Sequence, residues 1–165
     1  MKNNQKLAIG FTTGSCAAAA SKAATIMLIT GKEVESVKLC VPGGLTFLLK
    51  IEQVRRGENF VECSVCKDSG DDPDVTNGIR IFSKVVDLGI KDQDSTVQID
   101  GGIGIGRVTK PGLDQPIGEA AINRVPRKMI QTEVEQVKKE YQWNHDLEVT
   151  IFAPEGVEIA KQTFN

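Results

Sequence analysis

The stretch that most restricts how this chain can fold is an acidic loop between two segments with the composition of strands. Residues 67–78 read Lys-Asp-Ser-Gly-Asp-Asp-Pro-Asp-Val-Thr-Asn-Gly and carry four aspartates within seven positions. Charged carboxylates leave water only when they are paired or coordinated, so a core cannot absorb this loop. Gly70, Pro73 and Gly78 prevent a helix or regular strand from running through it. We therefore interpret the acidic loop as one wall of a site.

Two other stretches of unusual composition are predicted to oppose the acidic loop. Residues 10–16 read Gly-Phe-Thr-Thr-Gly-Ser-Cys, directly before an alanine-rich segment, and residues 101–112 read Gly-Gly-Ile-Gly-Ile-Gly-Arg-Val-Thr-Lys-Pro-Gly. The first places small residues and hydroxyls at a helix start, where backbone N–H groups and the helix dipole attract anions. A plain helix cap explains the same pattern, so both interpretations stay open.

The glycine run at 101–106 superficially matches a dinucleotide-binding fingerprint that follows a strand. The residues behind it cannot open a helix, so a pyrophosphate would have no helix terminus to bind. The alternative is a backbone that approaches a flat or bulky ligand, with Arg107 and Lys110 reaching its anionic groups. Arg124, Arg127 and Lys128 form a second basic cluster, which a solvated helix start would also explain.

Size and composition favour one globular domain. The chain has 165 residues, of which 40% are hydrophobic and 25% charged, and it has no apolar run long enough to span a bilayer. A net charge of −2 and an aromatic content of 5% argue against nucleic acid as a partner. The first residues contain no apolar signal region, so we expect a cytoplasmic protein with no membrane partner.

The cysteines and acidic residues do not follow a metal-binding pattern. Cys63 and Cys66 have the spacing of a zinc or redox pair, but in an alternating strand residues three apart point to opposite faces. We therefore predict buried, reduced thiols and no protein-bound metal. A cation at the acidic loop is an alternative, although the loop lacks calcium-ligand spacing. Cys16 would be activated if exposed at its helix start, but no histidine near it in sequence could act as its base.

The remaining pattern predicts an α+β fold. A helix over residues 15–30, capped by Thr12, Thr13 or Ser15 and stopped by Gly31, is apolar all round and should be central. A second, amphipathic helix should start near Pro126, run to about Tyr141 and lie on a sheet. Strands are predicted over 34–41, 45–55, 60–66, 79–88, 95–100 and 147–153, the first three as an antiparallel meander. We expect a mostly antiparallel sheet with the helices packed on one face, in a strand order that the sequence does not reveal.

The three motif stretches resemble the CbiD family, and so does Pro-Ile-Gly-Glu-Ala-Ala-Ile-Asn-Arg-Val-Pro-Arg-Lys-Met-Ile at 116–130. The resemblance covers essentially the whole chain. Members are cobalt-precorrin-5B C(1)-methyltransferases of anaerobic cobalamin biosynthesis, which use S-adenosylmethionine to methylate a ring carbon of a cobalt-bearing tetrapyrrole. The resemblance implies this activity, this methyl donor and a ribosomal protein S5 domain 2-like fold. Because members are roughly twice as long, residues 1–165 resemble a single amino-terminal domain whose C-terminal, Rossmann-like partner domain is missing.

The resemblance and the residues together predict the roles of the site. A precorrin is a flat macrocycle fringed with acetate and propionate groups, which suits basic side chains, backbone N–H groups and glycine-rich surfaces. Asp68, Asp71 and Asp72 are the predicted catalytic residues, which orient ring nitrogens or enamine protons during an in-line methyl transfer. The predicted substrate-binding residues are Thr12, Thr13, Gly14, Ser15, Gly102, Gly104, Arg107 and Lys110. The cobalt belongs to the substrate, so no protein ligand for it is required.

Two other functions stay open from the sequence. The chain could be a non-catalytic tetrapyrrole-binding module that needs the missing domain for methyl transfer, in which case it would not turn over S-adenosylmethionine alone. A small nucleotide-binding enzyme built on the glycine run is weakened by the absence of a helix after that run.

Overall fold

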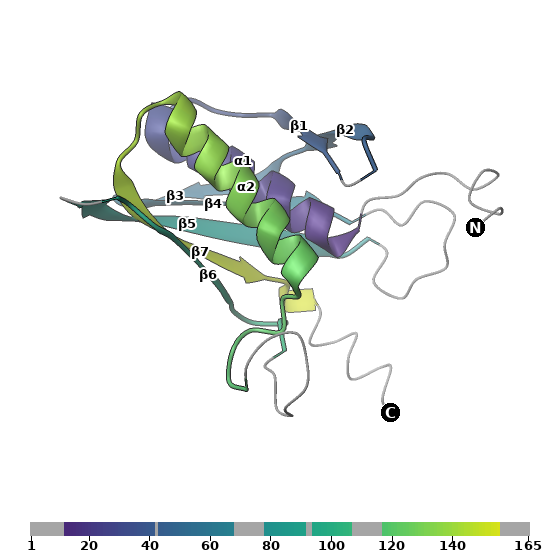
Figure 1. Ribbon diagram of the computed structural model, residues 1–165. Coiled ribbons are helices and arrows are strands. Elements are labelled where there is room, and N and C mark those ends of the chain that lie inside the picture. The colour runs from purple at the N-terminus through teal and green to yellow at the C-terminus, as the bar shows by residue number, and fades with distance from the viewer. Residues whose placement is uncertain (1–11, 42, 68–77, 92–93, 107–116, 156–165) are drawn as a thin grey trace.

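A computed structural model describes residues 12–41, 43–67, 78–91, 94–106 and 117–155. Within these ranges the chain forms a layer of two helices on one face of a five-stranded sheet, with a two-stranded hairpin beside the helices (Figure 1). The elements are α1 (Thr13–Thr30), β1 (Ser36–Cys40), β2 (Thr46–Lys50), β3 (Glu52–Arg56), β4 (Phe60–Cys66), β5 (Arg80–Ile90), β6 (Val97–Gly101), α2 (Arg124–Glu140) and β7 (His145–Phe152). Neither helix has the length and apolar character needed to cross a bilayer, as judged over these ranges.

The predicted central helix is confirmed as α1. Thr12 has an extended backbone and caps the helix by accepting a hydrogen bond from the Ser15 amide at 3.0 Å. Gly31 ends the helix in the left-handed conformation, with its amide bonded to the Met27 carbonyl. The alanines of α1 are fully or almost fully buried, because the helix packs against β4, β5, the β1–β2 hairpin and α2. Small side chains on every side thus let four neighbours approach α1 closely.

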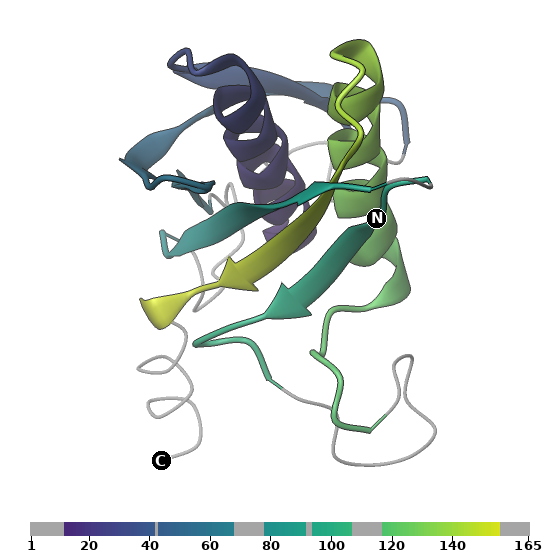
Figure 2. The ribbon, with the colours of Figure 1, turned by 90° about the vertical axis from the view of Figure 1, so that its left-hand side faces the viewer.

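The main sheet has the strand order β3-β4-β5-β7-β6. It is antiparallel except for β6 and β7, which pair in parallel. A parallel pair needs a crossover connection, and α2 lies in the chain between β6 and β7. The turned view in Figure 2 shows both helices on the same face of this sheet. The prediction of a mostly antiparallel sheet with helices on one face is confirmed.

The predicted three-strand meander is wrong at its middle strand. Residues 45–55 form two strands, of which β2 pairs with β1 in a separate sheet and β3 pairs with β4. Ile51 interrupts them: its side chain is buried and its amide donates a hydrogen bond to the Glu35 carbonyl at 2.9 Å. Gln53 then has a φ of 51°, and the β3–β4 register shifts in a bulge. The chain therefore bends out of one sheet into the other.

The second predicted helix is confirmed as α2, but its main partner differs from the prediction. Ile130, Val134 and Val137 are buried as predicted, and they pack chiefly against α1, while β6 is the main contact of α2 in the sheet. Tyr141, predicted on the same face, follows the helix end and is 41% exposed. The helices α1 and α2 thus pack against each other and together cover one face of the sheet.

Candidate functional site

The described residues that border the three motif stretches lie at one end of the domain, which we call the motif end. Cys66 of β4 lies opposite Arg80 of β5, so the acidic loop begins and ends there. Its base is closed by a hydrogen bond from the Lys67 amide to the Ile79 carbonyl and one from the Gly78 amide to the Lys67 carbonyl, both 2.7 Å. The parallel strands β6 and β7 end at the same side, and both helices begin there (Figure 1).

The N-termini of α1 and α2 lie side by side at the motif end. Gly14 contacts Pro126 so closely that a Cβ at Gly14 would lie 3.0 Å from the Cβ of Pro126. Asn123 makes no side-chain cap to α2, and neither helix has an acidic residue in its first turn. The positive ends of two helix dipoles are therefore adjacent, with no carboxylate in either first turn to compensate them, and this arrangement attracts anions.

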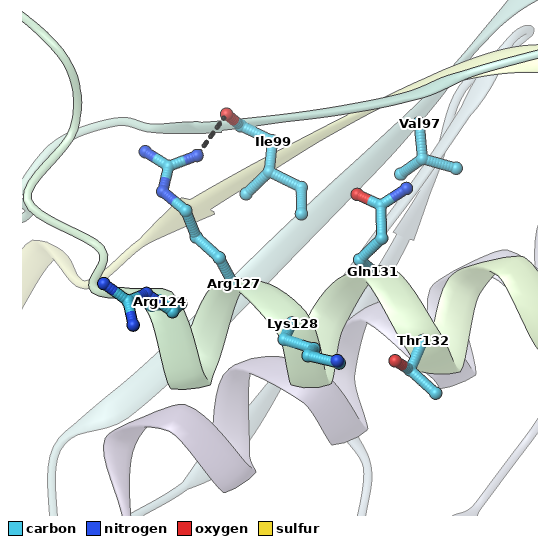
Figure 3. Close-up of a pocket in the computed structure, with 7 residues that line it drawn as sticks. All are labelled: Val97, Ile99, Arg124, Arg127, Lys128, Gln131 and Thr132. Atoms are coloured by element: carbon cyan, nitrogen blue, oxygen red, sulfur yellow. Dashed lines mark hydrogen bonds between the residues drawn. The ribbon is translucent and has the colours of Figure 1, made fainter. Parts of the chain in front are cut away.

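A groove of about 480 Å³, here called the basic groove, lies between α2 and the edge strand β6 (Figure 3). Figure 3 shows the side chains of Arg127 and Gln131 rising from the helix toward β6. The groove is lined by Val97, Ile99, Arg124, Arg127, Lys128, Gln131 and Thr132. Three cations beside two helix N-termini make this groove positively charged.

Arg127 holds the wall of the basic groove together. Its guanidinium donates hydrogen bonds to the carbonyls of Ile122 at 2.7 Å, Ala120 at 3.1 Å and Ile99 at 3.3 Å. It thereby joins α2 to strand β6 and to the segment that precedes the helix. Arg124 and Lys128 are exposed, so these two side chains are the cations of the groove that a ligand can reach.

The predicted residues of the first motif mostly shape the start of α1. The hydroxyls of Thr12 and Ser15 lie 2.9 Å apart, and Ser15 is buried. Gly14 is the close-contact position against Pro126, and Thr13 is exposed at the first position of the helix. The cap that the sequence offered as an alternative is therefore present.

The glycine run packs against the end of β7. A Cβ on Gly104 would overlap the carbonyl of Ala153, and the φ of Gly104 is +84°. The Gly102 amide donates to the Ile151 carbonyl, and the Ala153 amide donates to the Ile103 carbonyl, both at 2.8 Å. We predicted that the backbone of the glycine run approaches a ligand. In the structure, Gly102 and Gly104 instead approach the end of β7 and the residue that follows it. The predicted residues Arg107 and Lys110, like Asp68, Asp71 and Asp72 of the acidic loop, lie outside the described residues.

The thiols differ from the prediction in one case. Cys16 and Cys63 are fully buried, which removes the exposure that a nucleophilic Cys16 would need. Burial raises the pKa of Cys63 to about 12, and its Sγ lies 3.2 Å from the Ala20 carbonyl. Cys66, predicted to be buried together with Cys63, is only half-buried, and Cys40 is exposed at the end of β1. In the parts of the chain that the structure describes, no cluster of three or more histidine, cysteine or acidic side chains could hold a metal.

The model of the CbiD family matches residues 1–165. The chain belongs to the CbiD family. It is 47% identical to the cobalt-precorrin-5B C(1)-methyltransferase of Ruminiclostridium cellulolyticum, an alignment that covers 100% of this chain and 42% of that protein. The protein of the same name from Treponema denticola is 49% identical, over 99% of this chain and 44% of its own length. The chain thus spans less than half the length of these curated relatives.

A solved structure of this family has the same fold. The crystal structure of the cobalamin biosynthesis protein CbiD from Archaeoglobus fulgidus aligns with a TM-score of 0.68 and 31% sequence identity. The alignment covers 95% of this chain and 47% of that chain. The likeness to the second domain of ribosomal protein S5 remains a prediction.

The sequence pointed to part of the basic groove and missed the rest. Arg124, Arg127 and Lys128 stood out as a cluster, but a helix start could explain them equally. Val97 and Ile99 gave no signal, because they line a groove only when β6 is the edge strand beside α2. Strand order is a property of the whole chain that local patterns do not carry.

Proposed function

We propose that this chain forms the amino-terminal, substrate-binding domain of a two-domain cobalt-precorrin-5B C(1)-methyltransferase. Relatives that are 43–49% identical carry that name. The observation that carries the proposal is the basic groove beside two adjacent helix N-termini, at the end where the bordering residues of all three family motifs lie. A cytoplasmic site of action remains part of the proposal.

The proposed substrate suits this end of the domain by its charge. A cobalt-precorrin carries several acetate and propionate groups around a flat ring. Arg124 and Lys128 would bind such carboxylates through charge-assisted hydrogen bonds, and the N–H groups that begin α1 and α2 would bind others. The net charge of the whole chain is −2, so the attraction is local to this end. Arg107 and Lys110 are proposed to add to it.

The acidic loop is proposed to act on the ring itself. Carboxylates accept hydrogen bonds from N–H groups, so Asp68, Asp71 and Asp72 would orient the ring nitrogens or steer a proton of the reacting enamine. These groups would lie at the same end of the domain as the cations that hold the fringe of the ring. Orientation of this kind is the main contribution that a protein makes to an in-line displacement.

The methyl donor that the name implies is S-adenosylmethionine, and the basic groove does not fit its reactive end. The sulfonium is a cation, and the groove is lined by Arg124, Arg127 and Lys128. Like charges at close range destabilise a complex. We therefore propose that the donor binds outside this groove, and the groove is kept for the anionic substrate.

A direct test is a titration of the chain with a cobalt-tetrapyrrole that carries the native acetates and propionates, followed by its visible spectrum. S-adenosylmethionine is titrated separately by calorimetry. Binding of the tetrapyrrole without the donor supports a substrate-binding domain, and binding of both, with methyl transfer, would place the whole activity in this chain. Absence of tetrapyrrole binding would contradict the proposal.

A second candidate is a tetrapyrrole-binding module with no catalytic role of its own residues. It is favoured by the fact that the chain spans 42–44% of its relatives. The discriminating experiment supplies the rest of a relative's chain in trans and replaces Asp71 by Asn. Loss of methyl transfer with unchanged tetrapyrrole affinity favours the methyltransferase role, and unchanged transfer favours the passive module.

A further inference from the structure

A second groove lies on the other side of the first turns of α2. It measures about 470 Å³ and lies between this helix and the end of β1. Its lining residues are Cys40, Val41, Arg124, Val125, Lys128, Met129, Thr132 and Glu133. We call it the apolar groove, because Val41, Val125 and Met129 supply aliphatic and thioether surface. Val125 is 57% exposed, which leaves a large apolar side chain uncovered in the described part of the chain.

One ridge of α2 separates the two grooves. Arg124, Lys128 and Thr132 line both of them and follow each other at intervals of four residues, so they form a single stripe along the helix. The acidic side chain in the apolar groove, Glu133, is paired with Lys22, with 3.5 Å between Oε1 and Nζ. The ridge therefore presents positive charge, and the acid beside it is already compensated.

A ligand that covers both grooves must be apolar on one part and anionic at its edge. Aliphatic surface favours a ring or chain that is shielded from water, whereas Arg124 and Lys128 favour carboxylates within one side-chain length of it. A tetrapyrrole with carboxylates around its rim has this distribution. A simple dicarboxylate would leave the apolar groove uncovered, and an uncharged ring would make no use of the positive charge on the ridge.

We propose that the apolar groove holds one edge of the tetrapyrrole ring, whose carboxylates bind Arg124 and Lys128 from the ridge. The inference rests on the proposed function and adds to it the side of α2 on which the ring lies. The basic groove, on the other side of the ridge, then receives carboxylates that extend beyond the ring. Val125 and Met129 become determinants of ring binding, separate from the cations that bind its fringe.

Cys40 provides a native reporter for this position. It is exposed and lines the apolar groove, whereas Cys16 and Cys63 are buried. Its alkylation by iodoacetamide is followed by mass spectrometry, with and without saturating cobalt-tetrapyrrole. The alkylation rate of Cys40 should fall by about fivefold or more, because the bound ring blocks access to the thiol.

The matched control moves the thiol along the same strand, in a Cys40→Ser, Ser36→Cys chain, since Ser36 is also exposed but does not line the groove. Its alkylation should not change.

A charge placed in the groove gives a second measurement. Val125→Glu puts a carboxylate beside the ring edge, while an acidic residue near a helix N-terminus is favourable for folding. The expected result is tetrapyrrole binding weaker by about tenfold or more, because the added carboxylate competes for Arg124 and Lys128 and repels the carboxylates of the ring. Leu48→Glu is the control, because Leu48 is 64% exposed and lies outside both grooves.

Full tetrapyrrole affinity in Val125→Glu, with an unprotected Cys40, would overturn this inference and leave the proposed function standing. Failure of the unmodified chain to bind tetrapyrrole would overturn the proposed function and this inference with it.

Discussion

Gly14 of α1 and Pro126 of α2 are in direct contact, and a Cβ at Gly14 would lie only 3.0 Å from the Cβ of Pro126. This contact brings the positive ends of two helices together at the motif end. It joins the first family motif to the segment that follows the third. A residue that reads as a flexible glycine in the sequence is therefore a helix-packing position that shapes the anion-attracting end of the domain.

Replacing Gly14 by valine should separate the two helix starts. Overpacking at a close contact costs about 1–3 kcal/mol, so the free energy of unfolding should fall by this amount in urea titrations. Thr13→Val is the control, because Thr13 is exposed and adjacent in sequence. Equal stability of the two variants would show that the contact does not constrain the helices.

Arg127 and Lys128 are neighbours with different predicted roles. Arg127→Gln leaves the carbonyls of Ile99, Ala120 and Ile122 without their shared donor. The Ala120 carbonyl still accepts a hydrogen bond from the Ile122 amide at 2.8 Å. Loss of the other two contacts should lower the free energy of unfolding by about 1–3 kcal/mol. Lys128→Gln, an exposed substitution, should change stability by less than about 0.5 kcal/mol. Lys128→Gln should nevertheless weaken tetrapyrrole binding, and a loss of stability in both variants would contradict this division of roles.

The four thiols should differ sharply in reactivity. Cys40 is exposed, so a disulfide reagent can reach its thiol. Burial raises the pKa of Cys63 to about 12, so this thiol stays protonated and shielded, and Cys16 is fully buried. Titration with Ellman's reagent should therefore detect Cys40 first and should detect Cys16 and Cys63 only in denaturant. Rapid reaction of a third thiol in the folded chain would contradict the described packing.

Lys138 should make the free energy of unfolding depend on pH in the alkaline range. It is 4% exposed, its Nζ donates to the Ser95 hydroxyl at 2.7 Å, and burial lowers its pKa from the ordinary 10.5. Glu135, Asp146 and Asp87 oppose this shift through their negative charge. Between the lowered pKa and 10.5 the unfolded chain binds more protons than the folded chain, so this residue's contribution to stability rises with pH in that window.

The comparison that isolates this effect uses Lys138→Met, which lacks the titrating amine. The difference in free energy of unfolding between the original chain and this variant should move in favour of the original chain as pH rises from about 7 toward 10.5. Chemical denaturation at a series of pH values gives that difference. A difference that stays constant, or that moves the other way, would show that the amine titrates normally in the folded chain.

The elements that local chemistry determines were predictable, and those that depend on distant partners were not. Thr12 and Gly31 mark the ends of α1 through capping rules that involve only neighbouring residues. The break at Ile51 could not be predicted, because residues on both sides have strand character and the bend depends on which sheet each side joins.

The candidate site shows the same division. The sequence identified three motif stretches that belong together, and their described borders do lie at one end. It attributed the close approach of Gly104 to a ligand, whereas the structure shows Ala153 of the same chain in that position. The roles of Asp68, Asp71 and Asp72 remain predictions, since these residues lie outside the described ranges.

The measurement that tests the central claim most directly compares tetrapyrrole affinity in two double variants that each lose two positive charges. Arg124→Gln with Lys128→Gln removes the exposed cations at the start of α2, whereas Lys32→Gln with Lys139→Gln removes exposed cations at the opposite ends of the same two helices. We predict that the first pair weakens binding of the cobalt-tetrapyrrole by about tenfold or more and that the second leaves it unchanged. Equal weakening by both pairs would mean that only overall charge matters, and unchanged binding in the first pair would contradict the assignment of this end as the substrate site.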